Sequence, residues 1–224
     1  MAAATEERKA ETRDMIIQAA RKVFSEKGYH KAQISDIVKE AGISTGSVYA
    51  HFKDKLDLFE QISRENLENL RTRLKELRQT THPGDVRERV QRWKQTYAAF
   101  FDYVDANPEQ ILMIVRGGFG VDEDHDASLW EYFNLFASDI AEDFIKWQQL
   151  GFIKVGNAHL MGHIVIGMSM HVAHSYLVDK QFTRTEAINN LMAMNHAMFS
   201  IYLTHKGRNV LGDLSVPQLP HDEE

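Results

Sequence analysis

The strongest constraint on the fold is the segment 34–52, which reads as two short helices joined by a tight turn. Its first half repeats apolar residues at the spacing i, i+3, i+4 and i+7, which predicts one apolar helix face: Ile34, Ile37, Val38 and Ala41. Gly42 follows directly, where a left-handed backbone can end a helix, and Ser44 is placed to cap the next one. The segment therefore predicts a helix-turn-helix, which places its second helix in the major groove of DNA.

Several short motifs surround and include this segment. They are Phe-x-x-x-Gly-Tyr at 24–29, Asp-Ile at 36–37, Ala-Gly-Ile-Ser at 41–44, Gly-x-x-Tyr at 46–49 and Phe-x-x-Lys at 52–55. With these motifs in order, residues 9–62 resemble the N-terminal domain of tetracycline-repressor (TetR) family regulators. The resemblance implies an all-α chain with an N-terminal three-helix DNA-binding domain and a C-terminal helical domain for ligand binding and dimerisation. Beyond residue 70 only the helical layout resembles the family.

The second helix of the motif carries mainly small or hydrogen-bonding side chains, which suit a phosphate-lined groove. Thr45, Gly46, Ser47 and His51 are candidate readers of base edges, and Tyr49 can donate a hydrogen bond to a phosphate. The resemblance adds Lys55 as a phosphate contact, with Lys53 beside it, and Gln33 where the family usually has threonine or serine. The alternative for Tyr49 and His51 is packing beneath the helix. The expected DNA-binding residues are Gln33, Ser44, Thr45, Gly46, Ser47, Tyr49, His51, Lys53 and Lys55.

The charge is unevenly distributed along the chain. Residues 1–55 hold ten Lys and Arg against eight Asp and Glu, whereas the whole chain of 224 residues has a net charge of −6. The N-terminal part is therefore the part suited to phosphate, and the acidic remainder limits indiscriminate DNA binding. The absence of cysteine excludes disulfides and thiolate metal sites, and the early charged residues do not form a signal peptide. We expect a cytoplasmic protein.

The helical periodicity predicts a helix-turn-helix domain at 1–55 (motif about 33–52), an effector-binding and dimerisation domain at 56–206 and a mobile tail at 207–224. Glycine and acidic residues at 116–126 predict a loop. The expected helices are about 6–27, 54–81, 85–106, 109–115, 128–150, 158–178 and 184–204.

The segment 159–178 has no formal charge over twenty residues, so a membrane span has to be weighed. Its four histidines argue against a span, and burial in a subunit interface is the alternative. The family resemblance implies that the last two long helices pair with those of a second copy, which makes a homodimer. A membrane partner is not expected.

Aromatic and methionine residues gather between 93 and 147, more than a thin helical layer needs. A mostly apolar pocket with a few polar groups is the usual site for a small organic molecule. Each of these residues could instead be simple core. The candidate effector-binding residues are Trp93, Tyr97, Phe100, Gln110, Met113, Arg116, Phe119, Trp130, Phe133 and Asn134.

Histidine pairs on one predicted helix suggest a possible metal site. His159 and His163 are four residues apart, and His171 and His174 are three apart, so each pair shares a helix face. Carboxylates at 131, 139, 142 and 143 could complete a ligand set. The alternative is that neutral imidazoles line a polar dimer interface.

The leading hypothesis is a homodimeric, ligand-responsive transcriptional regulator, most simply a repressor released from a near-palindromic operator in double-stranded DNA by a small effector. The alternative is a helical metal-binding protein or metalloenzyme using the His159–His174 face. No catalytic constellation stands out, so an enzyme is not expected. No cofactor is required by the sequence; a small organic effector is expected and a bound metal stays open.

Overall fold

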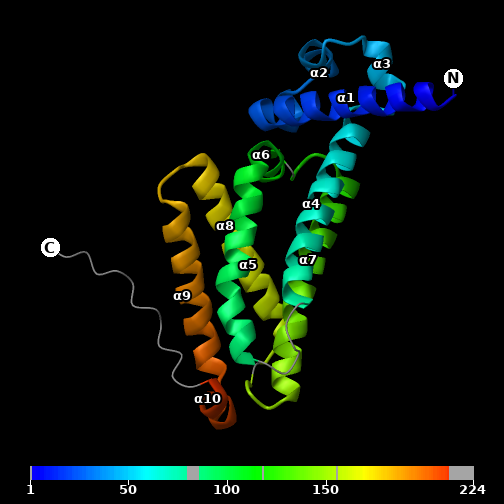
Figure 1. Cartoon of the computed structure of the whole chain (residues 1–224). Helices are drawn as coiled ribbons and strands as arrows, with labels where there is room; N and C mark the ends of the chain where they lie inside the picture. The colour runs from blue at the N-terminus through cyan, green and yellow to red at the C-terminus, as the bar shows by residue number, and fades with distance from the viewer. Residues whose placement is uncertain (1, 80–85, 118, 155, 212–224) are drawn as a thin grey trace. The chain divides into compact units, whose positions relative to one another are not determined.

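The computed structural model describes residues 2–79, 86–117, 119–154 and 156–211, with the side chains of 2–5, 79, 86–91, 116, 117 and 211 outside the description. Over these residues the expected all-α fold class is confirmed, and β-structure is limited to an isolated bridge between Ile153 and Leu203. The helices, labelled in Figure 1, are α1 (Ala2–Lys31), α2 (Ile34–Ala41), α3 (Thr45–Tyr49), α4 (Lys55–Gln79), α5 (Val86–Ala106), α6 (Pro108–Gly117), α7 (Glu123–Gln149), α8 (Ala158–Val178), α9 (Arg184–Tyr202) and α10 (His205–Leu211).

The chain divides into two compact units. The N-terminal unit comprises Met1–Asn69 with Asn107–Leu129, and the bundle unit comprises Leu70–Ala106 with Trp130–Glu224. Helices α4 and α7 each contribute to both units. The domain limits expected from the sequence, 1–55 and 56–206, stay a prediction.

The core of the N-terminal unit is built on α1. One apolar stripe of this helix is buried throughout: Ile16, Ile17, Ala20, Val23 and Phe24. Ile37 from α2, Val48 from α3 and Phe59 from α4 pack into the same core. Burial of one such side chain stabilises the fold by about 1.5–3 kcal/mol. This core therefore fixes the short helices α2 and α3, which are too short to be stable alone.

The turn between α2 and α3 has the expected geometry. Gly42 adopts a left-handed backbone with φ 67°, and its N–H donates to the carbonyl of Val38. The Ser44 Oγ accepts a hydrogen bond of 3.1 Å from the Ser47 N–H, which caps α3. The predicted roles of Gly42 and Ser44 in the turn are confirmed.

The end of α1 differs from the expectation of a helix stopping at residue 27. Gly28 has φ 71° and ψ 164°, which breaks the helix, and a further short turn runs on to Lys31. The stop signal was therefore located correctly, but the chain returns to helical geometry after it.

The expected loop at 116–126 is shorter than predicted, because α6 continues to Gly117 and α7 begins at Glu123. The acidic residues act as helix-start residues rather than as a solvated loop. The Asp122 Oδ1 accepts from the Asp124 N–H at 3.0 Å, and both Asp126 oxygens accept from the Gly120 N–H. Carboxylates in this position satisfy free N–H groups and favour the positive end of the helix dipole.

In the bundle unit α8 and α9 form an antiparallel pair, and α5 packs on α9 (Figure 1). The core contains a cluster of aromatic rings in which Trp147 contacts Trp93, Phe144 and Phe199. A capping box closes the start of α9, since the Glu186 carboxylate accepts from the Thr183 N–H and the Thr183 Oγ1 accepts from the Glu186 N–H. These capped, aromatic-rich contacts hold α9 in place.

The C-terminal region corrects the expectation of a tail starting at 207. Residues 207–211 belong to α10, where Gly207 lies close to the Phe152 carbonyl, while 212–224 lie outside the described residues.

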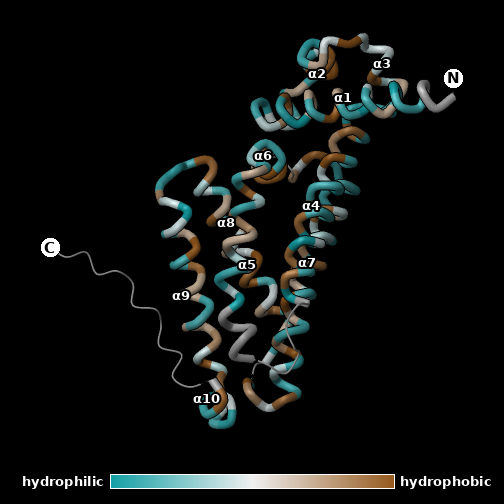
Figure 2. The backbone as a smooth tube through the Cα atoms, in the orientation of Figure 1, coloured by the Kyte–Doolittle hydropathy of each residue, from teal (hydrophilic) through white to brown (hydrophobic). Residues whose placement is uncertain are grey.

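Helix α8 consists mainly of hydrophobic and intermediate residues, coloured brown and pale in Figure 2, with a few hydrophilic ones between them. Among the described helices, none combines the length and the apolar character needed to cross a bilayer, α8 included.

Candidate functional site

The short helix α3 presents a polar face to solvent. Val48 and Phe52 are buried in the core beneath it, while Thr45 and Gly46 are exposed. Tyr49 has 54% of its surface exposed, so it does not pack under the helix. His51 is half-buried. The arrangement leaves the small and hydrogen-bonding side chains of α3 available to a partner.

Ser44 and Ser47 are partly used within the turn itself. Their hydroxyl oxygens lie 2.8 Å apart, in addition to the Ser47 N–H bond to Ser44. Ser44 therefore fixes the start of α3 and so orients the residues that follow it. Gly46 is not required by packing, because a Cβ built there would meet only the Ser44 Oγ at 3.8 Å. An absent side chain at this exposed position suits close approach of another molecule to the backbone.

Gln33 occupies the N-cap of α2. Its N–H donates to the Asp36 carboxylate at 3.1 Å, and its side-chain Oε1 accepts from the Ser35 hydroxyl at 3.3 Å. The capping function that the family usually gives to threonine or serine is thus supplied mainly by Asp36. The exposed Gln33 amide still has its NH₂ group on the surface.

Lys55 lies in an unexpected position for a phosphate contact. Its Nζ donates to the carbonyls of Tyr29 at 2.8 Å and Ala32 at 3.0 Å and sits 4.1 Å from the Tyr29 ring centroid. Burial lowers the pKa of the Lys55 ammonium. In this structure Lys55 closes the end of α1, whereas Lys53 is exposed. The carbonyls at the end of α1 have no helical partner, and only the folded chain brings a lysine to them.

The candidate effector residues divide between the two units. Gln110, Met113 and Phe119 belong to the N-terminal unit, as does Arg116, whose side chain lies outside the described part. Met113 is 1% exposed and packs in the core with α1, so its expected place in an effector pocket is corrected. Phe119 is exposed.

The remaining candidates lie in the bundle unit. Tyr97, Phe100 and Phe133 are buried, Trp93 is half-buried, and Trp130 and Asn134 are exposed. Trp130 contacts the Phe133 ring at a centroid distance of 5.9 Å. Of the six aromatic candidates, all except Phe119 thus lie in the bundle unit, on α5 and α7.

A buried polar cluster beside Tyr97 was missed in the sequence. The Asn195 Nδ2 donates to the Tyr97 hydroxyl, and burial raises the pKa of Tyr97 to about 12. Neither the Asn195 Oδ1 nor either ring nitrogen of the adjacent His196 has a hydrogen-bond partner among the described residues. Asn195 interrupts the apolar stripe of α9, which is the signal that could have revealed it. Unsatisfied polar atoms in an apolar surrounding suit the polar group of a small ligand.

We expect the stability of the protein to fall as the pH drops below about 6.5. Burial lowers the pKa of His196 in the folded chain. As the pH falls, His196 therefore binds a proton in the unfolded chain before it does so in the folded chain. The free energy of unfolding thus decreases between the ordinary pKa and the lowered one. Urea unfolding at pH 7.5 and pH 5.5 measures the effect. The variant His196→Gln should lose less stability over this range, and an equal loss in both proteins would contradict the assignment.

The histidines considered as candidate metal ligands do not form a site with the neighbouring carboxylates. His159, His163 and His171 are exposed on α8 and His174 is half-buried. Asp139 instead pairs with Arg71, and Glu142 lies 4.0 Å from Lys146. In the part of the chain that is described, no group of three His, Asp or Glu side chains could hold a metal ion. The metal-based alternative is therefore not favoured.

A groove of about 660 Å³ lies in the N-terminal unit, and none of the expected effector residues lines it. Its charged lining is mainly acidic, with Glu11, Asp14, Glu40 and Glu109 around one lysine, Lys22. Lys22 is already paired with Glu40 at 2.6 Å. Such a groove is unsuited to phosphate or another anionic ligand.

The helix-turn-helix matches a known protein family, and the chain is similar to several named regulators. Residues 16–62 match the family model described as "Bacterial regulatory proteins, tetR family". The chain is 29% identical over 109 residues to the HTH-type transcriptional activator FasR of Mycolicibacterium smegmatis, which covers 49% of this chain and 48% of FasR. It is 25% identical over 204 residues to the HTH-type transcriptional regulator HbdR of an Aromatoleum species, covering 90% of this chain and 85% of HbdR. The chain thus spans only about half the length of FasR.

A solved structure with the same fold is the transcriptional regulator FadR of Bacillus subtilis in complex with stearoyl-CoA. The TM-score is 0.68 at 19% identity, and the match covers 80% of this chain and 95% of FadR. At this identity the similarity establishes the shared helical fold.

Proposed function

We propose that this chain, which belongs to the TetR family of bacterial regulatory proteins, is a DNA-binding transcriptional regulator whose affinity for its operator is set by a small organic effector. The observation that carries the proposal is the exposed polar face of α3, held from beneath by Val48 and Phe52. The relatives are named regulators, which supports a role other than catalysis. Such a protein acts on the chromosome in the bacterial cytoplasm.

In this proposal α3 lies in the major groove. Thr45, Ser47 and His51 read base edges, and Gly46 lets the backbone come close to the DNA. Tyr49 and Lys53 contact phosphates and hold the helix in register. Lys55 contributes to the same contacts if its ammonium turns from the end of α1 toward a phosphate. Ser44 and Gln33 act at the starts of α3 and α2, where free N–H groups also favour an anion.

We expect the variant Tyr49→Ala to bind operator DNA about tenfold more weakly, because a hydrogen bond to a charged phosphate oxygen is lost. The operator is first recovered from random duplexes by selection with the purified protein, and affinity is then measured by fluorescence anisotropy. The fold should not change, since Tyr49 is exposed.

The matched control is Met15→Ala, which removes another exposed apolar side chain from the same unit. Met15 is 48% exposed on α1, outside α3. Equal affinities for Tyr49→Ala and Met15→Ala would remove Tyr49 from the DNA interface. Failure of the unchanged protein to select any duplex would contradict DNA binding itself.

We further propose a homodimer formed through α8 and α9. The exposed positions of α8 follow one stripe and include three of the four histidines: His159, Leu160, His163, Ile164, Gly167 and His171. On α9 the exposed apolar residues are Met194 and Ile201. Pairing of this α8–α9 face with a second copy would cover the apolar side chains and place the histidine side chains in the interface. Two α3 helices could then meet a near-palindromic operator in grooves about 34–36 Å apart.

The effector in this proposal is an amphipathic acyl thioester. FadR, which shares the fold, is in complex with stearoyl-CoA, and the bundle unit of this chain offers buried aromatic rings beside the unsatisfied polar atoms of Asn195 and His196. The effector binds more tightly to a state of the dimer in which the two α3 helices cannot both lie in the grooves. Its binding therefore lowers the affinity for the operator. A regulator that is released from DNA in this way acts as a repressor.

A further inference from the structure

Arg13 lies at the N-terminal end of the buried stripe of α1. Position 13 precedes Ile16 and Ile17 by three and four residues, so it shares their helix face, one turn before the buried core begins. The side chain is half-buried, and its guanidinium carbon lies 5.5 Å from the centroid of the Phe52 ring. A long cationic side chain in such a place packs its stem on apolar surface and keeps its charged group at the rim. The guanidinium of Arg13 therefore lies where α1 meets the end of the helix-turn-helix.

A chain of hydrogen bonds fixes the orientation of this guanidinium. Arg13 NH2 donates to Gln61 Oε1 at 3.0 Å, and Gln61 Nε2 donates to Asp57 Oδ1 at 2.7 Å. The second oxygen of Asp57 accepts from the backbone N–H of Lys53 at 2.8 Å. Arg13 is thus linked through two side chains of α4 to Lys53, which contacts a phosphate in the proposed function.

The positive charge of Arg13 has no direct counterion. Among the described residues Arg13 makes no ion pair, and its guanidinium donates only to the neutral amide of Gln61. Asp57 is separated from Arg13 by Gln61, and both of its oxygens already accept hydrogen bonds. The other N–H groups of the guanidinium stay available to a further acceptor. A neutral partner thus orients Arg13 without neutralising it.

The next three cations of α1 differ from Arg13, because each pairs with a carboxylate of the same unit: Arg21, Lys22 and Lys27. Arg13 belongs to the N-terminal half of α1, and Figure 1 shows α3 beside that half. The unpaired charge therefore lies on the part of α1 that is next to the proposed DNA-reading helix.

We propose that Arg13 binds a phosphate of the DNA backbone, next to the phosphate contacted by Lys53. A guanidinium presents several N–H groups in one plane, which match two oxygens of one phosphate. Such a contact holds α3 in register and carries no sequence information, because the phosphate is the same at every nucleotide. The inference rests on the proposed function, in which α3 lies in the major groove, and it adds α1 to the DNA interface.

The test compares Arg13→Met and Arg13→Lys with the unchanged full-length protein. Affinity for the selected operator and for an unrelated duplex is measured by fluorescence anisotropy at a series of KCl concentrations. Arg13→Met keeps an apolar stem against Phe52 but removes the charge, so we expect about tenfold weaker binding of both duplexes. The slope of log Kd against log salt should fall by about 0.9 for each phosphate contact that is lost. Arg13→Lys keeps the charge, and its slope should stay that of the unchanged protein.

The matched control is Lys22→Gln, which removes a positive charge from the same helix but within the acidic groove. Its affinity and its salt dependence should equal those of the unchanged protein. Circular dichroism at the temperature of the titration verifies that each variant is folded.

Unchanged affinity and slope in Arg13→Met would overturn the inference and leave Arg13 as a packing partner of Phe52. Weaker binding with an unchanged slope would overturn it as well, because Arg13 would then act by holding Gln61 and Phe52 in place. Both outcomes leave the regulator assignment intact, since the unchanged protein still binds its operator. Failure of the unchanged protein to bind any duplex would instead contradict the proposed function, and this inference with it.

Discussion

The variant Gly162→Ala is expected to lower the free energy of unfolding by about 3 kcal/mol. A Cβ built at Gly162 would lie 2.1 Å from the Ala137 carbonyl oxygen and 2.9 Å from its carbon. The obstacle is backbone of α7, which cannot rotate away as a flexible side chain can. Helices α7 and α8 would therefore have to separate, and the loosened contact would reach the buried residues Met161 and Ala141 nearby. A loss of this size corresponds to a fall in the melting temperature of roughly 6–12 °C.

Gly167 provides the matched control within the same helix. No atom lies within 4 Å of a Cβ built there, so Gly167→Ala should leave the bundle intact and gain about 0.5–1 kcal/mol from helix propensity. Thermal unfolding followed by circular dichroism compares the two variants. Equal melting temperatures would refute the close approach of α8 to α7. A change of oligomeric state in Gly167→Ala would report on the α8–α9 face, not on helix packing.

The helix-turn-helix could be predicted from the sequence because its determinants are local. The apolar spacing of α2, the left-handed Gly42 and the capping Ser44 all act within a few residues of their own position. The same holds for the capping box of Thr183 and Glu186. In such segments the pattern of side chains and the backbone conformation agree, so the sequence alone predicts the element.

Acidic residues at 122–126 led to a wrong boundary for α7. Clustered acids next to glycine resemble a solvated loop, yet they also stabilise the first turn of a helix. The loop and the helix differ in whether backbone N–H groups of the first helical turn lie within hydrogen-bond distance of the carboxylates. Asp122 accepts from the Asp124 N–H in the first turn of α7, which favours the helix, whereas Asp126 within that turn accepts from the Gly120 N–H before it.

The positions that sequence reasoning misplaced depend on distant contacts. Met113 was grouped with the aromatic residues, but α6 packs on α1 and brings it into the N-terminal core. Lys55 binds carbonyls that lie 26 and 23 residues earlier in the chain. Gly162 and Gly167, about which the sequence made no prediction, also differ only through a distant contact, because the backbone of α7 lies against Gly162 and no atom lies within 4 Å of a Cβ at Gly167. Local patterns hold no information on such pairs.

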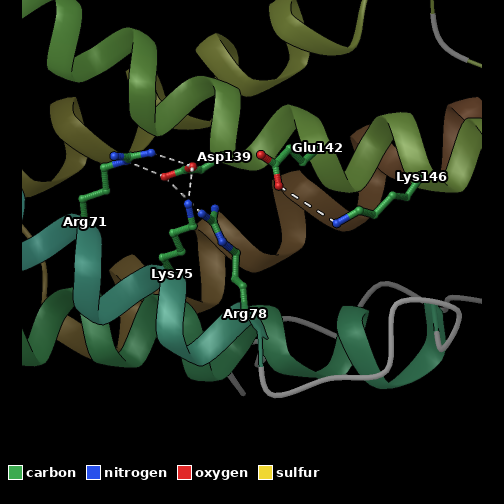
Figure 3. A network of polar contacts seen from close by, with 6 residues as sticks. All are labelled: Arg71, Lys75, Arg78, Asp139, Glu142 and Lys146. Atoms are coloured by element: carbon green, nitrogen blue, oxygen red, sulfur yellow. Dashed lines mark hydrogen bonds and ion pairs between the residues drawn. The ribbon is translucent and has the colours of Figure 1, made fainter.

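The ion pairs between α4 and Asp139 of α7 show both kinds of information (Figure 3). The spacing of Arg71, Lys75 and Arg78 places them on one helix face and is visible in the sequence. Their common partner, Asp139, follows 61 to 68 positions later and is identified only by the fold. The sequence offers this carboxylate only as one of four that could complete a candidate metal site. In the structure Arg71 donates a hydrogen bond to each carboxylate oxygen of Asp139.

The variant Ile201→Glu is expected to convert the proposed homodimer into a monomer and to weaken operator binding at least about a hundredfold. Ile201 is 75% exposed, so the fold of the single chain has little reason to change. Within the α8–α9 face, however, a carboxylate would be buried against the apolar side chains of the second copy, including Leu160, without a partner. A monomer then binds one half-site and loses the tethered second contact. Sedimentation velocity at micromolar concentration and anisotropy with the selected operator measure both effects.

The control for this experiment is Leu150→Glu, which places the same charge on an exposed apolar position just past the end of α7. It lies outside the α8–α9 face and should leave a dimer with normal operator affinity. If Ile201→Glu stays dimeric, the interface is elsewhere and the exposed histidines of α8 need another explanation. If it becomes monomeric yet binds the operator with full affinity, two copies are not needed for recognition, and the near-palindromic operator is no longer required. Only joint loss of dimer and affinity supports two α3 helices acting together on one operator.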